Sequence, residues 1–279
     1  MKKEELLGKE FKVLDKGFVR LVDVMGDDDS IVQAARVSYG QGTKTVHEDR
    51  GLIRYLLRHK HTTPLEMVEF KFHIKLPIFI ARQWIRHRTA NVNEYSGRYS
   101  EMTDDFYLPD PEQIRPQSTM NRQGRSEEEL PDQTAMEIRT KLLNTQIKLY
   151  DEYKDLLNKD LARELARINL PLSNYTEWYW KIDLHNLMHF LKLRLDSHAQ
   201  YEIRMFGQAM ADIVKQIVPV AWEAFEDYQL NSMAFSGPES KVLKELLSGK
   251  NIEEINFESH GLKAREEREF KEKYKTITS

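Results

Sequence analysis

No cysteine occurs among the 279 residues of the chain. This absence excludes disulfide bonds, thiolate zinc sites and every mechanism that needs a cysteine nucleophile. Long apolar runs are missing too: none reaches the length of a membrane span, and the N-terminal residues lack the apolar core of a signal peptide. We therefore expect a cytoplasmic protein with no membrane partner.

A strong excess of charge of either sign is also missing. Lys and Arg number 42 against 45 Asp and Glu, and the formal net charge is −3. This balance argues against a protein that coats nucleic acid, so any anion-binding site must be local. Hydrophobic residues make up 40% of the chain, which is enough for a sizeable core.

Three common site motifs are absent from the sequence. Neither GxGxxG nor GxxxxGK[ST] occurs, so neither a dinucleotide fingerprint nor a P-loop is supported. GxSxG is missing as well, which leaves Ser96 and Ser100 without the usual context of a serine nucleophile.

The residue pattern predicts an α+β fold. Residues 10–24 mix β-branched and aromatic side chains around a Lys-Gly turn, as strands do, and residues 67–76 alternate strictly between apolar and polar. A loop is expected over residues 91–100. Helices are expected over residues 30–38, 47–59, 77–87, 134–157, 161–171 and 185–218.

Two segments differ in composition from the rest. Residues 109–133 hold four prolines and an acidic run, and we expect a mobile insertion there. After about residue 236 the composition shifts, and ten of the thirteen residues from Lys263 to Lys275 are charged. We interpret residues 1–235 as the functional domain and residues 236–279 as a charged extension that is either a solvated helix or disordered.

The most informative run is RHRTANVNEYSGRYS, residues 86–100, which we call the signature segment. From Arg82 to Ser100 there are four arginines and one acid, Glu94, so the formal local charge is +3. Guanidinium groups this close repel one another unless an anion joins them, and they bind phosphate in two parallel hydrogen bonds. The alternative is a solvated basic face whose ion-pair partners lie elsewhere in the chain.

Histidines and arginines on the later helices allow more than one interpretation. His185 and His189 stand four residues apart, and His198 follows, a spacing that can hold a metal. The signal is weak because neither a glutamate in an HExxH pattern nor a thiol accompanies them, so we predict no metal. Arg167 and Arg194 lie in apolar stretches, where a buried ion pair with Glu164 or Asp196 is the structural alternative.

The signature segment resembles that of the flavin-dependent thymidylate synthases. It reads Arg-His-Arg, seven residues, Ser96, and then Gly-Arg-Tyr-Ser. Four further blocks agree in family order, and the similarity covers roughly residues 10–230. These blocks are HTTPLE at 61–66, ARQW at 81–84, AR with LP at 166–171, and LR with DSHAQ at 193–200.

This resemblance implies an enzyme that reductively methylates dUMP to dTMP. Methylene-tetrahydrofolate would donate the carbon, reduced FAD would supply the hydride, and NADPH would reduce the flavin. The missing cysteine agrees with this, because the other class of thymidylate synthases attacks the uracil ring with a cysteine thiolate.

The resemblance also implies roles for individual residues. Arg194 would be catalytic, because a fixed guanidinium beside the uracil ring stabilises negative charge that develops there. His61 would lie on the folate or nicotinamide side. The dUMP site would contain Gln83, Trp84, Ile85, Arg86, Glu94, Tyr95, Ser96, Gly97, Arg98, Arg167 and Arg194. FAD would contact Ser38, Thr63, Arg86, His87, Arg88, Glu94, Asp183, His185 and His189.

The family is homotetrameric, with active sites built from several subunits. Arg167 and Arg194 would then meet the signature segment across a subunit interface. The implied fold is α+β, with a central antiparallel or mixed sheet flanked by helices.

Two other functions fit parts of the sequence. A non-catalytic nucleotide- or RNA-binding module could use the Arg, His and Tyr of residues 82–100 to grip phosphates and stack on bases. It would bind oligonucleotides with an affinity that falls steeply with salt. A metal hydrolase built on His185, His189 and His198 would instead lose its activity with a chelator.

Overall fold

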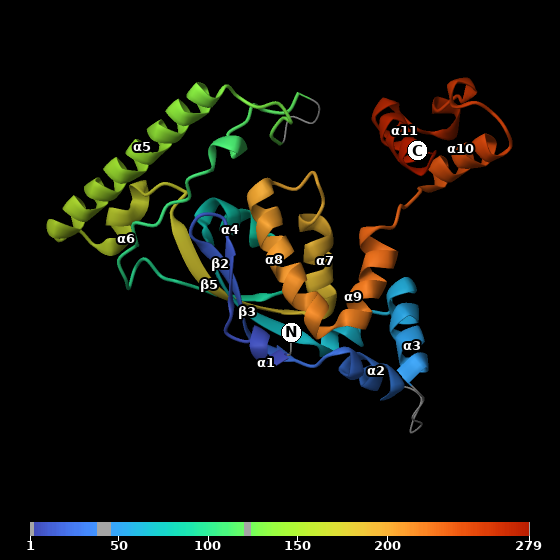
Figure 1. The fold of residues 1–279 in the computed structure, drawn as a ribbon, viewed down its shortest axis with the longest axis horizontal. Coiled ribbons are helices and arrows are strands. Elements are labelled where there is room, and N and C mark those ends of the chain that lie inside the picture. Colours follow the sequence, from blue (N-terminus) through green and yellow to red (C-terminus); the bar gives the residue numbers. More distant parts are fainter. Residues whose placement is uncertain (1–2, 38–45, 120–123, 279) are drawn as a thin grey trace. The chain divides into compact units, whose positions relative to one another are not determined.

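The computed structural model describes residues 3–37, 46–119 and 124–278. These form two compact units, Met1–Phe225 and Glu226–Ser279. The first unit contains all of the sheet and the helices α1 to α9 (Figure 1). Within the described ranges, no helix is long and apolar enough to span a bilayer.

An antiparallel five-stranded sheet forms the centre of the first unit, with the strand order β1-β2-β3-β5-β4. The expected strands near residues 10–24 and 67–76 are confirmed. Gly17 begins the second strand after the Lys-Gly turn, where a Cβ atom would lie only 2.7 Å from the carbonyl oxygen of Val13. The strands are β1 Glu10–Val13, β2 Gly17–Met25, β3 Glu69–Pro77, β4 Asn91–Glu94 and β5 Tyr175–Asp183.

One face of this sheet is buried, and β3 shows the cause. Alternation along a strand places every second side chain on the same face. On β3 the buried side chains are aromatic or aliphatic, and those between them are partly exposed. β5 continues the buried face, because Phe72 pairs with Trp180 and Ile74 pairs with Trp178.

Helices α4, α7 and α8 pack on the buried face (Figure 1). Trp84 of α4 makes edge contacts with Trp178 and Trp180, at ring-centroid distances of 5.8 and 5.3 Å. Phe190 of α7 and Phe206 of α8 complete this aromatic core. The helices are α1 Lys3–Leu6, α2 Asp28–Arg36, α3 Val46–Arg58, α4 Ile78–Trp84, α5 Asp132–Asn158, α6 Arg163–Ala166, α7 Leu184–Arg194, α8 Tyr201–Ile217 and α9 Pro219–Phe225.

Two strands differ from the sequence-based expectation. The expected loop over residues 91–100 begins with β4, which pairs with β5 so that Asn91 lies opposite Lys181 and Glu94 opposite Trp178. β5 itself was not expected, although it is an interior strand that lies between β3 and β4. Its alternation of Thr176, Trp178, Trp180 and Ile182 lies between two helical stretches of sequence and matches the buried face.

Several of the expected helices are shorter than the patterns that predicted them, whereas α5 extends beyond the expected 134–157 at both ends. The stretch 77–87 is helical only to Trp84, and 161–171 contains only α6 and a 3-10 turn, Arg167–Asn169. The stretch 185–218 is divided into α7 and α8 by residues 195–200. Helix α2 ends at Arg36, and the expected end at Ser38 lies outside the described residues.

The segment 109–133 makes specific contacts in its described part. It contains a 3-10 turn at Pro111–Gln113, and Arg115 donates to the carboxylate of Glu129. Arg125 pairs with Glu202 of α8, whose side chain is only 1% exposed. These contacts attach the two ends of the segment to each other and to the sheet-covering helices.

The second unit has a hydrophobic core of its own. Helices α10, Gly237–Leu247, and α11, Ala264–Thr278, belong to it. The charged stretch that includes Lys263 to Lys275 is therefore largely helical, and Phe270 within it is fully buried. The core consists of Val242, Leu246, Ile255, Phe257, Leu262 and Phe270.

Candidate functional site

The signature segment starts where α4 ends and follows the edge of the sheet. β4 is the last strand of the order, so it pairs with β5 alone within the sheet. After β4 the backbone N–H of Tyr95 donates to the carbonyl of Glu177, and those of Tyr99 and Ser100 donate to the carbonyl of Ser96. The helix end, the edge strand and this turn bring the basic residues into one short surface region.

Most of the guanidinium groups in this region have no acidic partner. Arg82, Arg86 and Arg88 are exposed, and none forms an ion pair with any described residue. Only Arg98 does, through a 3.0 Å contact between its Nε and the carboxylate of Glu164. Because three of the four positive charges are uncompensated, this region is suited to an anionic ligand rather than to a network of surface ion pairs.

Arg194 reaches the signature segment through His87. It is the last residue of α7, and its Nε and Nη2 lie 3.2 and 2.9 Å from the Nε2 atom of His87. Phe190, one turn earlier on α7, packs edge-on against the imidazole at a centroid distance of 4.9 Å. His189 lies farther away, with its ring centroid 6.2 Å from that of His87.

The electrostatics of this pair require a neutral histidine. An arginine side chain only donates, so the Nε2 atom that it contacts must be the accepting nitrogen. Burial lowers the pKa of His87 to about 4, and electrostatic interactions with Arg194 and His189 act in the same direction. Burial also lowers the pKa of Arg194, although a guanidinium remains charged at any physiological pH.

Gly97 allows the turn of the signature segment to approach Arg167. The glycine is buried, and a Cβ atom there would lie 2.7 Å from Sδ of Met102 and 3.1 Å from Nη1 of Arg167. Any larger residue would displace one of these side chains. Arg167 itself is exposed, at the start of the 3-10 turn after α6.

These contacts bear on two expectations about the arginines. Arg167 and Arg194 contact the signature segment within one chain, and contacts across a subunit interface stay a prediction. The alternative of buried ion pairs with Glu164 or Asp196 is wrong. Glu164 pairs with Arg98, and Asp196 pairs with His198 at 2.8 Å.

The other residues expected at the nucleotide fall into two groups. Glu94 accepts a 2.8 Å hydrogen bond from Thr176 of β5, a partner that the sequence analysis missed because β5 was not recognised. Ile85 and Tyr95 are 38% and 42% exposed, so both are accessible. Trp84 is fully buried in the aromatic core, so none of its surface is accessible to a ligand in this structure. Gln83 has a buried Oε1 with no hydrogen-bond partner in the structure.

Some of the residues expected at FAD lie outside the signature segment. Thr63 precedes a 3-10 turn, Leu65–Met67, that packs against α7, and the N–H of Leu184 donates to the carbonyl of Val68. Asp183 caps α7, because its carboxylate accepts from the backbone and the side-chain amide of Asn186. Ser38 lies outside the described residues.

The two remaining histidines have different surroundings. His61 packs edge-on against Tyr55, at a centroid distance of 5.7 Å. His185 lies in the first turn of α7 and is partly buried. In the described part of the chain, no group of three His, Asp or Glu residues could hold a metal ion.

Known proteins share both the sequence and the fold of this chain. Residues 20–220 match the family model described as thymidylate synthase complementing protein. A flavin-dependent thymidylate synthase of Treponema denticola is 55% identical over 270 residues, which cover 97% of this chain and 98% of the relative. A flavin-dependent thymidylate synthase of Rickettsia bellii is 54% identical over 275 residues, covering 94% and 92%.

A solved structure is similar to most of this chain. It is the UMP/dUMP methylase PolB of Streptomyces cacaoi, determined with 5-bromo-dUMP bound. The two chains are 32% identical with a TM-score of 0.72, and the match covers 79% of this chain and 99% of that one.

Proposed function

Because this chain belongs to the flavin-dependent thymidylate synthase family, a family of methyltransferases, we propose that it converts dUMP to dTMP. Methylene-tetrahydrofolate donates the carbon, and NADPH supplies the reducing equivalents through FAD. The observation that carries this proposal is the Arg194 guanidinium held against the signature segment, beside arginines that lack acidic partners.

The donor set of the site fits FAD and a nucleotide. Both ligands are planar and carry phosphate, and the guanidinium groups of Arg82, Arg86 and Arg88 are exposed and without ion-pair partners among the described residues. Arg86, His87 and Arg88 would hold FAD, with Thr63, Glu94, Asp183, His185, His189 and the undescribed Ser38. Reduced FAD, when bound, supplies the hydride.

The residues expected at dUMP have complementary tasks. The phosphate calls for guanidinium and backbone N–H donors, which Arg98, Arg167 and the turn at Gly97 offer close together. The aliphatic and aromatic side chains of Ile85 and Tyr95 are exposed beside them. The proposed nucleotide site also includes Gln83, Trp84, Arg86, Glu94 and Ser96.

Arg194 is the proposed catalytic residue. His87 contacts its guanidinium, and Phe190 packs against His87, so the guanidinium is oriented before any ligand binds. A preoriented charge stabilises an anionic ring without the cost of reorganising water, so it favours the transition state more than the ground state. His61 is proposed to lie on the folate or nicotinamide side.

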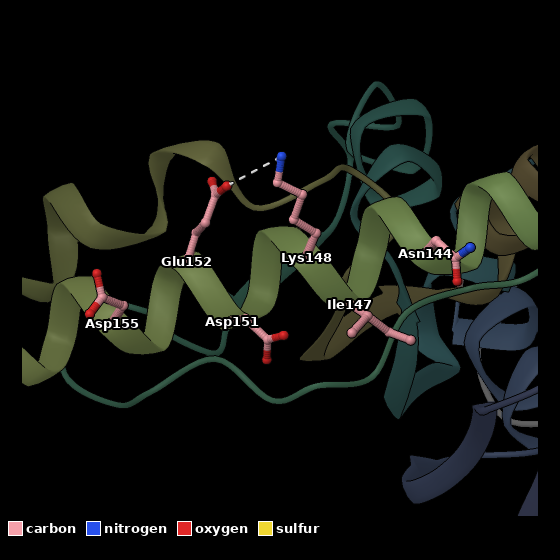
Figure 2. A pocket seen from close by; sticks show the side chains of 6 residues that line it. All are labelled: Asn144, Ile147, Lys148, Asp151, Glu152 and Asp155. Atoms are coloured by element: carbon pink, nitrogen blue, oxygen red, sulfur yellow. Dashed lines mark ion pairs between the residues drawn. The ribbon is translucent and has the colours of Figure 1, made fainter.

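Helix α5 supports the proposal that the protein assembles as a homotetramer. Over its 27 residues only Ala135, Gln146 and Tyr153 are buried. Large apolar side chains point to solvent instead, and Ile147 is 50% exposed. The pocket in Figure 2 is lined by side chains of α5 alone, among which Ile147 is apolar and the others are polar or charged. We propose that a second copy of the chain covers this helix.

The reaction and the cofactor can be tested together on the purified protein. It should take up FAD and turn yellow, oxidise NADPH in response to dUMP, and form dTMP only when methylene-tetrahydrofolate is present. A colourless protein that binds neither FAD nor dUMP would contradict the proposal. Affinity for oligonucleotides that falls steeply with salt would instead favour the nucleotide-binding module.

The role of Arg194 predicts a separation between flavin binding and turnover. Arg194→Ala should retain FAD, because FAD is assigned to other side chains. Its dTMP formation should fall by about 10²–10³-fold, the usual effect of removing one preoriented electrostatic group. Single-turnover product formation and the flavin spectrum measure the two quantities, and unchanged turnover would remove Arg194 from the catalytic role.

A further inference from the structure

Two N–H groups of Arg194 converge on a single acceptor atom. Its Nε and Nη2 lie 3.2 and 2.9 Å from Nε2 of His87, although the two residues are 107 positions apart in the sequence. A guanidinium is planar, so two contacts along one edge fix both its position and its plane. Among the described residues, His87 alone hydrogen-bonds the Arg194 guanidinium, which leaves its other edge available to a ligand.

We propose that His87 is a positioning residue for Arg194. Its Nε2 atom accepts the hydrogen bonds of the guanidinium, and its Nδ1–H group faces the cofactor side. The inference rests on the proposed function of this site. It gives each of the two nitrogens of the imidazole a different task. Nε2 orients the charge that acts on the nucleotide, and Nδ1 belongs to the region assigned to FAD.

The chemistry of the acceptor explains why a histidine suits this position. A carboxylate would hold the guanidinium equally well, but its negative charge would cancel most of the field that Arg194 applies to the ring. A neutral imidazole orients the guanidinium and leaves its charge uncompensated. Burial and the charge of Arg194 keep His87 neutral, with its pKa lowered to about 4.

The surrounding core holds the imidazole in place. Phe190 packs edge-on against it and, on the other side, lies 4.6 Å from the Trp84 ring by centroid distance. Phe190 and Arg194 are four residues apart on α7, so they share one face of that helix and both contact His87. The fully buried Trp84 thus connects the pair to the sheet.

Two amide substitutions can separate the tasks of the two nitrogens. The Oε1 atom of His87→Gln can occupy the place of Nε2 and accept from Arg194. The shorter side chain of His87→Asn reaches only the place of Nδ1, where its amide can donate. His59→Gln, an exposed histidine at the end of α3, is the matched control.

The FAD-loaded variants are compared in FAD affinity, dUMP affinity and kcat for dTMP formation. We expect His87→Asn to lose roughly tenfold to hundredfold in kcat, the effect of removing one hydrogen bond to a charged group. His87→Gln should recover most of that loss, and His59→Gln should behave as the wild type. If Gln and Asn are equally impaired, or if Asn is the more active, the inference is wrong.

A second measurement depends on binding alone. In an Arg194→Ala background, the Gln and Asn variants of His87 should bind dUMP with the same affinity, because the group that distinguishes them is gone. A difference that persists there would show that His87 acts independently of Arg194. If the wild type itself forms no dTMP, the proposed function fails; if it does and the amides do not differ, only this inference fails.

Discussion

At the scale of single residues, the site depends on contacts between positions far apart in the chain. His87 meets Arg194, and Gly97 meets Arg167, because α7 and the turn after α6 both end beside the signature segment. The sequence identified these residues through a family resemblance. It could not show the contacts, because spacing constrains neighbours on one helix or strand and not residues in different elements.

Gly97 gives a prediction about packing. Gly97→Ala should destabilise the protein by about 1–3 kcal/mol, because the new methyl group overlaps Met102 and crowds Arg167. It should also weaken dUMP binding by displacing Arg167. Urea unfolding and calorimetry with dUMP measure the two effects. Gly51→Ala on α3 is the control, since its Cβ would meet nothing within 4 Å, and equal effects in both variants would contradict the prediction.

His87 gives a prediction about pH. Its pKa is lowered from 6.5 to about 4 by burial, Arg194 and His189. Between these values the unfolded chain binds a proton that the folded chain does not, so stability should fall as pH drops from 7 to 4. In His87→Gln this contribution is absent. Urea unfolding at several pH values should show a smaller loss of stability for the variant than for the wild type. Equal losses of stability in the two proteins would contradict the prediction.

At the scale of elements, burial decided which strands could be recognised from the sequence. β3 alternates between apolar and polar residues, so its strand was predicted. β5 carries aromatic residues on both faces, with Tyr179 46% exposed between the buried Trp178 and Trp180, and this hides the alternation. β4 has four exposed residues and depends on its pairing with β5, so it has no pattern of its own.

The helices of the second unit give a prediction about local stability. Phe270→Ala should cost about 3–5 kcal/mol in that unit, because the side chain is fully buried in its core. Hydrogen exchange of α10 and α11 should accelerate, while the amides of β3 and β5 remain protected. Ile277→Ala, at a position that is 50% exposed, is the control and should change little. Equal acceleration in the sheet would show that the two units unfold together.

At the scale of the whole molecule, α5 carries apolar side chains that folding of the described chain leaves exposed. Its sequence showed helical spacing, but spacing alone does not tell whether an apolar residue faces the same chain or another one. Ile147 and Leu143 are exposed, so the described part of the chain does not bury these side chains. The proposed second copy would do so.

This surface gives a prediction about assembly. Ile147→Lys should shift the protein toward smaller species, since each buried isoleucine contributes about 1.5–3 kcal/mol and a buried lysine adds a further cost. Analytical ultracentrifugation measures the distribution of species. Asn158→Lys adds the same charge at the exposed end of α5 and should leave assembly unchanged. A wild type that sediments as a monomer would refute the tetramer.

The aromatic core beneath the site also has an optical consequence. Of the four tryptophans, Trp84 contacts both Trp178 and Trp180, and Phe190 joins Trp84 and Trp180 to His87. Three of the four tryptophans therefore belong to the aromatic core that supports the signature segment. A flavin absorbs where tryptophan emits, so its arrival at this segment would quench that emission, and the chain carries its own label for following cofactor binding in real time.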